Sequence, residues 1–166
     1  MSKHDHYHGI VAVPWGALGY STRDGALAGI DFLPPRTAVR PARDVLGRRI
    51  EAQLQHFIKD PGAGFDIPLL PAGTAYQRRV WSALQRIAPG ERITYGELAR
   101  RLRSGPRAVG GACRANPIPL VIPCHRVVAA KGLGGYCGAP TERMQRVKQW
   151  LLAHEAGVAT AATVPG

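Results

Sequence analysis

Acidic side chains are scarce in this chain of 166 residues, in which 11 Asp and Glu face 22 Lys and Arg. The resulting formal charge of +11 and a sequence pI near 10.4 describe a surface that attracts polyanions. Nucleic acid is the first candidate partner, an anionic membrane the second and an acidic protein the third. Charge alone does not choose among these partners.

Long apolar runs and paired cysteines are also missing. No apolar run approaches the roughly 20 residues that cross a bilayer, and residues 1–9 lack the apolar core of a secretory signal. The three cysteines, Cys113, Cys124 and Cys137, form an odd set without a close Cys-x-x-Cys pair, which disfavours a disulfide framework. We therefore expect a cytoplasmic protein in a reducing compartment, with no membrane association.

The remaining composition, 45% hydrophobic and 20% charged, is that of an ordinary globular protein. The charge is unevenly distributed. Residues 1–73 carry 8 basic and 7 acidic side chains, a net charge of +1, whereas residues 74–166 carry 14 and 4, a net charge of +10. Because the intervening Leu69–Gly73 contains the Pro and Gly typical of a boundary, we predict two domains, residues 1–73 and 74–166, and place polyanion binding in the second.

The first half predicts a small α/β domain. Turn signals such as Asp24-Gly25 separate three stretches that alternate or run apolar, which indicates an antiparallel sheet. The expected strands are residues 7–13, 18–22 and 26–33. Apolar residues then recur at helical spacing over residues 41–58, so a helix should cover the sheet. We expect this half to serve as a scaffold.

Three histidines near the start, His4, His6 and His8, alternate in the sequence. Such spacing places three imidazoles on one side of a strand, which fits a metal site. Terminal histidines without Cys or carboxylate support are more often solvated, so we predict no metal there.

The second half predicts short helices. Thr74 is an expected N-cap for a helix that Pro89-Gly90 closes, and Thr94-x-x-Glu97 forms a capping-box pattern for the next helix, which should stop at Ser104-Gly105. Pro106 suits the first turn of a third helix, expected over residues 106–115. Two short helices joined by a tight turn and rich in arginine suggest a helix-turn-helix motif.

That third helix has almost no side-chain bulk on much of its surface, owing to Ala108, Gly110, Gly111 and Ala112. A bare helix surface permits either tight packing on another helix or the close approach of a ligand backbone. Its two arginines, Arg107 and Arg114, favour DNA, because guanidinium groups bind phosphates and stack on bases.

The next segment, Pro117–Val128 (PIPLVIPCHRVV), contains three prolines that exclude both an extended helix and a regular central strand. It presents Cys124-His125 on a stiff, apolar turn. A single cysteine is most often an inert small hydrophobe. An adjacent histidine that acts as a base, directly or through a water, and the basic Arg126 favour a reactive thiolate instead.

These motifs resemble those of the O6-alkylguanine-DNA alkyltransferases, also called methylated-DNA–protein-cysteine methyltransferases. About ninety residues from Thr74 onward carry the resemblance, whereas the first half is similar in layout only. The matching stretches are RAVGGACRAN (107–116), PIPLVIPCHRVV (117–128), LGGY (133–136) and KQWLLAHE (148–155). The resemblance implies a small N-terminal α/β domain, with a sheet and a helix, followed by a mostly helical, winged-helix-like DNA-binding domain.

The resemblance also implies a chemistry. Cys124 would accept an alkyl group, methyl above all, from O6 of guanine and also from O4 of thymine in double-stranded DNA. His125 would take the thiol proton through a water, and Glu155 would orient the imidazole. Because the product is a thioether with no evident regeneration step, the protein would act once.

Further roles follow from the same resemblance. Arg107 would replace the flipped base in the stack, and the helix that carries Ala108, Gly110, Gly111 and Arg114 would lie in the minor groove. Tyr95, Tyr136 and the Val127 carbonyl would contact the base, Cys137 would belong to the pocket wall, and Asn116 would tie the helix pair to the active-site loop. A packed tyrosine beside the helix cap remains the weaker alternative for Tyr95, whereas Asn116 is equally well explained as a helix stop before Pro117.

The expected protein is a monomer without cofactors. Zinc occurs in the N-terminal domain of some relatives, but no cysteine precedes Cys113 here, so that site does not carry over. Two other classes of protein remain open. A binding-only relative would lack the nucleophile, and a helix-turn-helix regulator would need polar, base-reading side chains where this chain has Gly and Ala.

Overall fold

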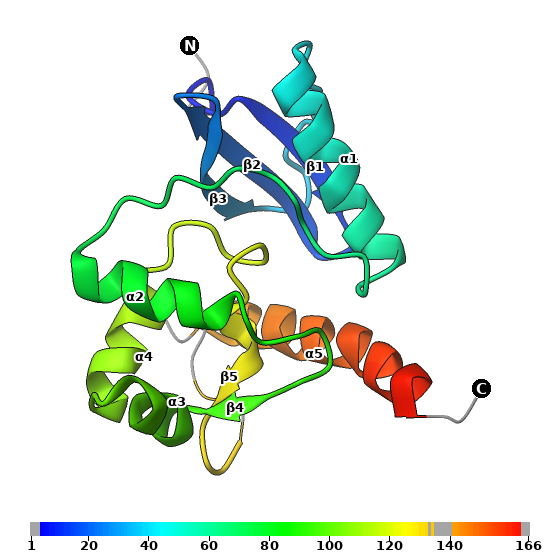
Figure 1. The fold of residues 1–166 in the computed structure, drawn as a ribbon. Helices are drawn as coiled ribbons and strands as arrows, with labels where there is room; N and C mark the ends of the chain where they lie inside the picture. The colour runs from blue at the N-terminus through cyan, green and yellow to red at the C-terminus, as the bar shows by residue number, and fades with distance from the viewer. Residues whose placement is uncertain (1–3, 133, 135–140, 164–166) are drawn as a thin grey trace. The chain divides into compact units, whose positions relative to one another are not determined.

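The structure is a computed structural model that describes residues 4–132, 134 and 141–163. The chain divides into two compact units, Met1–Ala72 and Gly73–Gly166, each considered separately below (Figure 1). The sequence placed the boundary after Gly73, and the structure has it before this residue. No helix in the described ranges is both long and apolar enough to cross a membrane.

The first unit is built on an antiparallel sheet in the order β1-β2-β3. Its strands are β1 (Gly9–Val13), β2 (Gly16–Arg23) and β3 (Ala26–Leu33). Asp24 and Gly25 join β2 to β3 with φ of 51° and 75°, the left-handed values that a two-residue hairpin requires. The sheet predicted from alternation and turn signals is therefore confirmed.

A single helix, α1 (Val45–Lys59), lies along the sheet and buries Ile50, Leu54 and Phe57 (Figure 1). The expected start at residue 41 is wrong. The Asp44 side chain accepts a hydrogen bond from the backbone N–H of Gly47 at 3.3 Å and so caps a helix that begins four residues later than periodicity suggested.

The second unit is mainly helical. Its helices are α2 (Ala75–Leu84), α3 (Tyr95–Leu102), α4 (Pro106–Arg114) and α5 (Glu142–Thr163). Thr74 caps α2 as expected: its hydroxyl accepts from the Gln77 N–H at 3.0 Å, and the Gln77 side chain accepts from the Thr74 N–H at 2.9 Å. The mixed α/β class predicted for the chain is thus confirmed.

The elements that position the site are held by contacts between distant segments. The indole N–H of Trp81 donates to the Ala112 carbonyl at 2.8 Å, which fixes α4 on α2. Two residues of β4 (Ile93–Thr94) pair in parallel with β5 (Val127–Val128), directly after the one-turn helix η1 (Cys124–Arg126). This pairing brings the start of α3 beside the segment that carries Cys124.

Candidate active site

The segment around Cys124 is a buried, internally hydrogen-bonded turn. Residues 118–127 are all buried, and Cys124 itself is 3% exposed. The Ile122 N–H donates to the Ile118 carbonyl at 2.9 Å, and the Cys124 N–H donates to the Ile122 carbonyl at 2.8 Å. Because the prolines fix φ and supply no N–H, this turn presents the thiol in one conformation.

Asn116 joins the end of α4 to this turn. Its amide donates to the Ile122 carbonyl at 2.8 Å, and its side-chain oxygen accepts from the Ile118 N–H at 2.9 Å. The residue therefore does more than stop a helix, since both ends of its buried amide hold the loop that leads to Cys124.

His125 lies in a buried charge network with Glu155, which comes from α5. Its Nε2 is 2.7 Å from Glu155 Oε2, and the two side chains are 0% and 1% exposed. Arg126 completes the network: its Nε and Nη2 donate to the two oxygens of Glu155 at 2.8 and 2.9 Å, and its Nη1 donates to the Ile87 carbonyl at 2.5 Å. Arg126 thus connects η1 both to α5 and to the turn after α2.

Burial and charge determine how these groups are ionised. Burial lowers the pKa of His125 by more than the hydrogen bond and charge of Glu155 raise it, so the imidazole is neutral at neutral pH. Burial alone would raise the pKa of Glu155, but hydrogen bonds from His125 and Arg126 and the positive charge of Arg126 lower it to about 2. Since the ionised carboxylate only accepts, His125 donates from Nε2, and Nδ1 is its basic nitrogen.

Cys113, the other cysteine in the described part of the chain, differs from Cys124. It lies on α4, and burial raises the pKa of its thiol to about 12. Such a thiol stays protonated and inert. Of these two cysteines, only Cys124 stands next to a base.

Lys148 is a residue that the sequence analysis did not assign to the site. Its side chain is fully buried, and its Nζ donates to the Val127 carbonyl at 2.7 Å. The same Nζ lies 5.9 Å from the centre of the Tyr95 ring. Gly134 lies against the same ring, since a Cβ added to it would be only 2.9 Å from a ring carbon of Tyr95. Lys148 therefore links Tyr95 to the strand that follows Cys124. Its position in the KQWLLAHE stretch was the only sequence signal.

The surface of α4 has two sides. Val109, Gly110, Ala112 and Cys113 are buried, whereas Arg107, Ala108 and Arg114 are exposed.

A side chain would find room at both glycines of α4, although Gly110 is itself buried and Gly111 half-buried. Apart from the backbone of α4 itself, a Cβ on Gly111 would meet no described atom within 4 Å, and one on Gly110 would meet only the end of the Arg114 side chain, at 3.6 Å. A lack of space for a side chain therefore does not explain why these two positions are glycine.

Two predicted residues, Tyr136 and Cys137, lie outside the described residues. Both ring nitrogens of His8, one of the three histidines near the start, are hydrogen-bonded within the protein. They lie 2.6 Å from Asp44 Oδ1 and 3.0 Å from Thr22 Oγ1, so neither faces a shared metal position. Among the side chains that the structure describes, no three potential metal ligands come together.

Comparisons with known proteins agree on one family. The family model for the DNA-binding domain of 6-O-methylguanine DNA methyltransferase matches residues 75–157. A methylated-DNA–protein-cysteine methyltransferase from Methanosarcina mazei is 45% identical over 92 residues, which cover 54% of this chain and 58% of the relative. One from Methanosarcina acetivorans is 33% identical over 138 residues, 78% of this chain and 88% of the relative. The match thus spans little more than half of the first relative and most of the second.

Solved structures give the same result. The crystal structure of Mycobacterium tuberculosis O6-methylguanine methyltransferase superposes with a TM-score of 0.74 at 32% identity, covering 90% of this chain and 93% of that one. A structure of that protein in complex with DNA has a TM-score of 0.74 at 33% identity, covering 89% and 91%. Fold and site therefore define an α/β protein with a buried Cys-His-Glu centre in its second unit. The chain belongs to the O6-methylguanine-DNA methyltransferase family, enzymes whose names give methylated DNA as substrate and a protein cysteine as acceptor.

Replacing Glu155 with Gln should destabilise the protein by about 3 kcal/mol, because Arg126 would stay buried without a counter-charge. The pKa of Glu155 in the folded state, about 2, is below its ordinary 4.5, so its stabilising effect is complete above pH 4.5 and is lost as the pH falls towards 2. The free energy of unfolding, measured by urea denaturation, should therefore differ strongly between the unsubstituted protein and Glu155→Gln at pH 7. At pH 3 the difference should be smaller.

The matched control is Glu97→Gln, which breaks a surface ion pair with Arg101 and should cost at most about 1 kcal/mol. Equal losses in the two variants at pH 7 would contradict the assignment of Glu155 as the centre of the network.

Proposed function

We propose that this protein repairs DNA by moving an alkyl group from O6 of guanine, and also from O4 of thymine, to its own Cys124 in a single turnover. The observation that carries the proposal is the buried Cys124 beside a neutral His125 that Glu155 holds at 2.7 Å. A thiol, a neutral base and an orienting carboxylate are the parts that an activated cysteine nucleophile requires.

The reaction is a displacement at a saturated carbon. The Cys124 proton passes to Nδ1 of His125 through a water, and the thiolate attacks the alkyl carbon. The new S–C bond forms as the O6–C bond breaks, and the guanine receives a proton in exchange for its alkyl group. Tyr95, at the start of α3, donates the hydrogen bond that stabilises the departing ring, and the charge of Lys148 beside Tyr95 favours that donation.

The base must leave the duplex to reach the thiol. Cys124 is 3% exposed, so a base that is stacked in DNA cannot approach it. Flipping costs a few kcal/mol, and we assign Arg107, exposed at the first turn of α4, to fill the gap left in the stack. The Val127 carbonyl, which has a second lone pair besides the one used by Lys148, accepts from the flipped base. Tyr136 and Cys137 would line the same pocket.

The exposed side of α4 provides the DNA contact. The open space over Gly111 lets a sugar-phosphate backbone approach the helix closely, and Arg114 supplies charge for phosphates. This surface suits the minor groove. The hydrogen-bonding groups of the four base pairs are nearly indistinguishable there, which is acceptable for a protein that inspects any sequence. Asn116 connects this helix to the loop of Cys124.

The proposed reaction needs no cofactor, since the damaged base is the donor and the cysteine is the acceptor. We further propose that the protein acts as a monomer, because every residue assigned to the site comes from one chain. A thiol nucleophile also implies a reducing compartment, for which the cytoplasm is the natural choice.

Mixing the protein with a duplex that carries O6-methylguanine should add one methyl group to Cys124, located by mass spectrometry of the intact chain and its peptides. The Cys124→Ala variant should accept no methyl group yet bind the same duplex, as measured by fluorescence anisotropy. Cys113→Ala is the control and should remain active, because its thiol stays protonated. Methylation at another residue, or none, would refute the repair proposal.

Arg107→Ala should slow methyl transfer in duplex DNA by roughly tenfold or more, because the flipped state loses its stabilising side chain. Transfer from a single strand should change little, since no stack has to be filled. Single-turnover rates on the two substrates provide the measurement, and Arg100→Ala, an exposed arginine of α3, is the control. A similar loss on both substrates would exclude the stacking role.

Gly111→Leu should preserve or raise stability, because leucine favours a helix over glycine by up to about 1 kcal/mol and the space around it is open. The same substitution should weaken duplex binding by roughly tenfold through a clash with DNA. Gly157→Leu is the matched control, since Gly157 is also helical with open space at its Cβ. Unchanged DNA affinity in Gly111→Leu would show that DNA does not approach this side of α4.

A further inference from the structure

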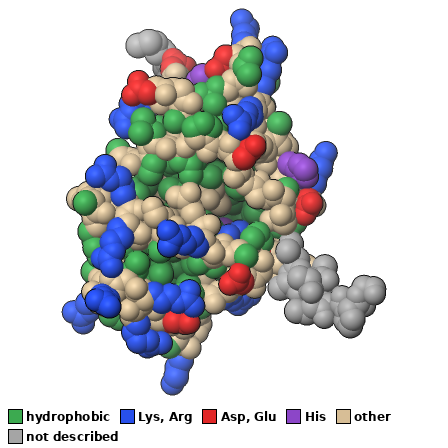
Figure 2. Space-filling model, viewed as in Figure 1, with side chains coloured by type: hydrophobic (Ala, Val, Ile, Leu, Met, Phe, Trp, Pro, Cys, Tyr) green, Lys and Arg blue, Asp and Glu red, His purple; other side chains and the backbone are tan. Residues whose placement is uncertain are grey.

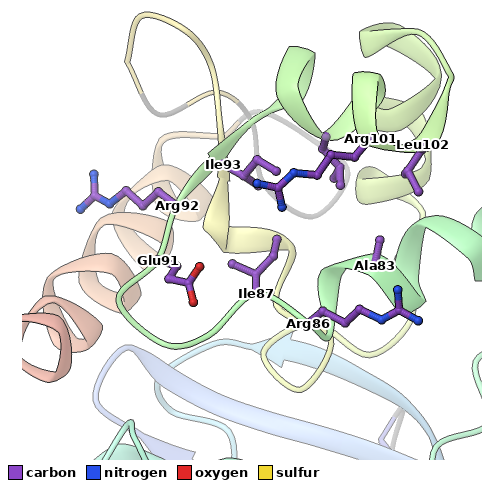
Figure 3. A pocket seen from close by; sticks show the side chains of 9 residues that line it. Ala83, Arg86, Ile87, Glu91, Arg92, Ile93, Arg101 and Leu102 are labelled. Carbon is purple, nitrogen blue, oxygen red and sulfur yellow. The ribbon is translucent and has the colours of Figure 1, made fainter. Parts of the chain in front are cut away.

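A small hollow lies on the second unit between the end of α2, strand β4 and helix α3 (Figure 3). Its volume is about 220 Å³. The apolar part of its lining comes from residues of all three elements and of the turn after α2, namely Ala83, Ile87, Ile93, Leu98 and Leu102. Ile87, Ile93 and Leu98 are buried and form part of the core, so the floor is rigid.

Charged side chains surround this apolar floor. Arg86, Arg92 and Arg101 are exposed at its edge together with one acidic residue, Glu91. Arg101 extends from α3 towards Ile93, whereas Arg92 points away from it (Figure 3). The ion pair of Arg101 with Glu97, at 3.1 Å, is a surface pair one helical turn apart and holds the guanidinium only weakly. The edge therefore attracts carboxylates.

Size and lining restrict what can occupy the hollow. It is smaller than the roughly 300 Å³ at which pockets for free ligands begin, but it accommodates one apolar side chain. A sugar-phosphate backbone would satisfy the arginines and leave the apolar floor empty. A second copy of this chain is disfavoured, because the second half carries a net charge of +10.

The hollow is separate from the residues assigned to DNA but joined to the active site. None of its lining residues belongs to α4 or η1. The Ile87 carbonyl accepts from Arg126, and Ile93 pairs with Val127, so the floor and the active site share backbone contacts. A ligand in the hollow can therefore be present while α4 is occupied.

We propose that this hollow binds a short segment of an acidic partner protein, in which one leucine-sized side chain enters the floor and flanking carboxylates pair with Arg86 and Arg101. The segment binds through side chains alone and involves no covalent step. Binding at this site does not require alkyl transfer, so a negative result for one activity does not contradict the other.

The probe is a synthetic peptide in which one leucine is flanked on each side by two aspartates. Its binding to the full-length protein is measured by fluorescence anisotropy, and the site is located by NMR of isotope-labelled isoleucine methyl groups. We expect shifts at Ile87 and Ile93. The double variant Arg86→Glu, Arg101→Glu should weaken binding by roughly tenfold or more. Ala83→Trp, which fills the hollow without a change in charge, should do the same.

Two controls separate docking from general charge attraction. The double variant Arg78→Glu, Arg100→Glu changes exposed arginines of α2 and α3 outside the hollow and should alter affinity by less than about twofold. A peptide with serine in place of leucine should bind at least about tenfold more weakly. The proposal is overturned if both double variants lose affinity for the peptide equally, or if the serine peptide binds as tightly as the leucine peptide. Displacement of the leucine peptide by undamaged duplex DNA would also overturn it.

Discussion

The second unit depends on one buried carboxylate. Glu155 comes from α5, and its two oxygens hold His125 and Arg126 of η1, while Arg126 also binds the carbonyl of Ile87 after α2. A buried charge costs several kcal/mol unless it is paired, so these segments are stable only together. The last helix is therefore part of the active site, although its Glu155 lies about thirty residues beyond the cysteine.

The same pairing sets the chemistry of the site. If Glu155 had only His125 as a partner, its charge would favour a protonated imidazole, which cannot act as a base. Arg126 is permanently charged and balances the carboxylate, so burial can keep His125 neutral. The network thus has a fixed cation, a fixed anion and one group that exchanges a proton. Figure 2 shows further basic side chains over the second unit, where they favour approach to a polyanion without entering this network.

Local signals predicted much of the fold, and long-range contacts explain what was missed. A few adjacent residues are enough to specify the Asp24-Gly25 turn, the Thr74 cap and the Cys124-His125 motif. The start of α1 was misplaced because Asp44, not the apolar period, decides it. The two-residue pairing of β4 with β5 is too short to produce alternation, and it joins residues 34 positions apart. Lys148 was missed because only the tertiary structure places its amine at the Val127 carbonyl.

Net charge and its placement have different explanations. Of the 14 basic residues in the second half, only Arg107 and Arg114 belong to α4, the helix that we assign to DNA. Attraction of a polyanion over a distance explains a large net charge wherever the arginines lie. It does not explain why Arg86 and Arg101 lie at the edge of an apolar hollow, because a solvated arginine needs no apolar neighbour and exposure of the apolar floor to water is unfavourable. A ligand that carries both carboxylates and an apolar side chain pairs with the arginines and covers the apolar floor. The hollow therefore fits an acidic segment with an apolar anchor better than it fits DNA.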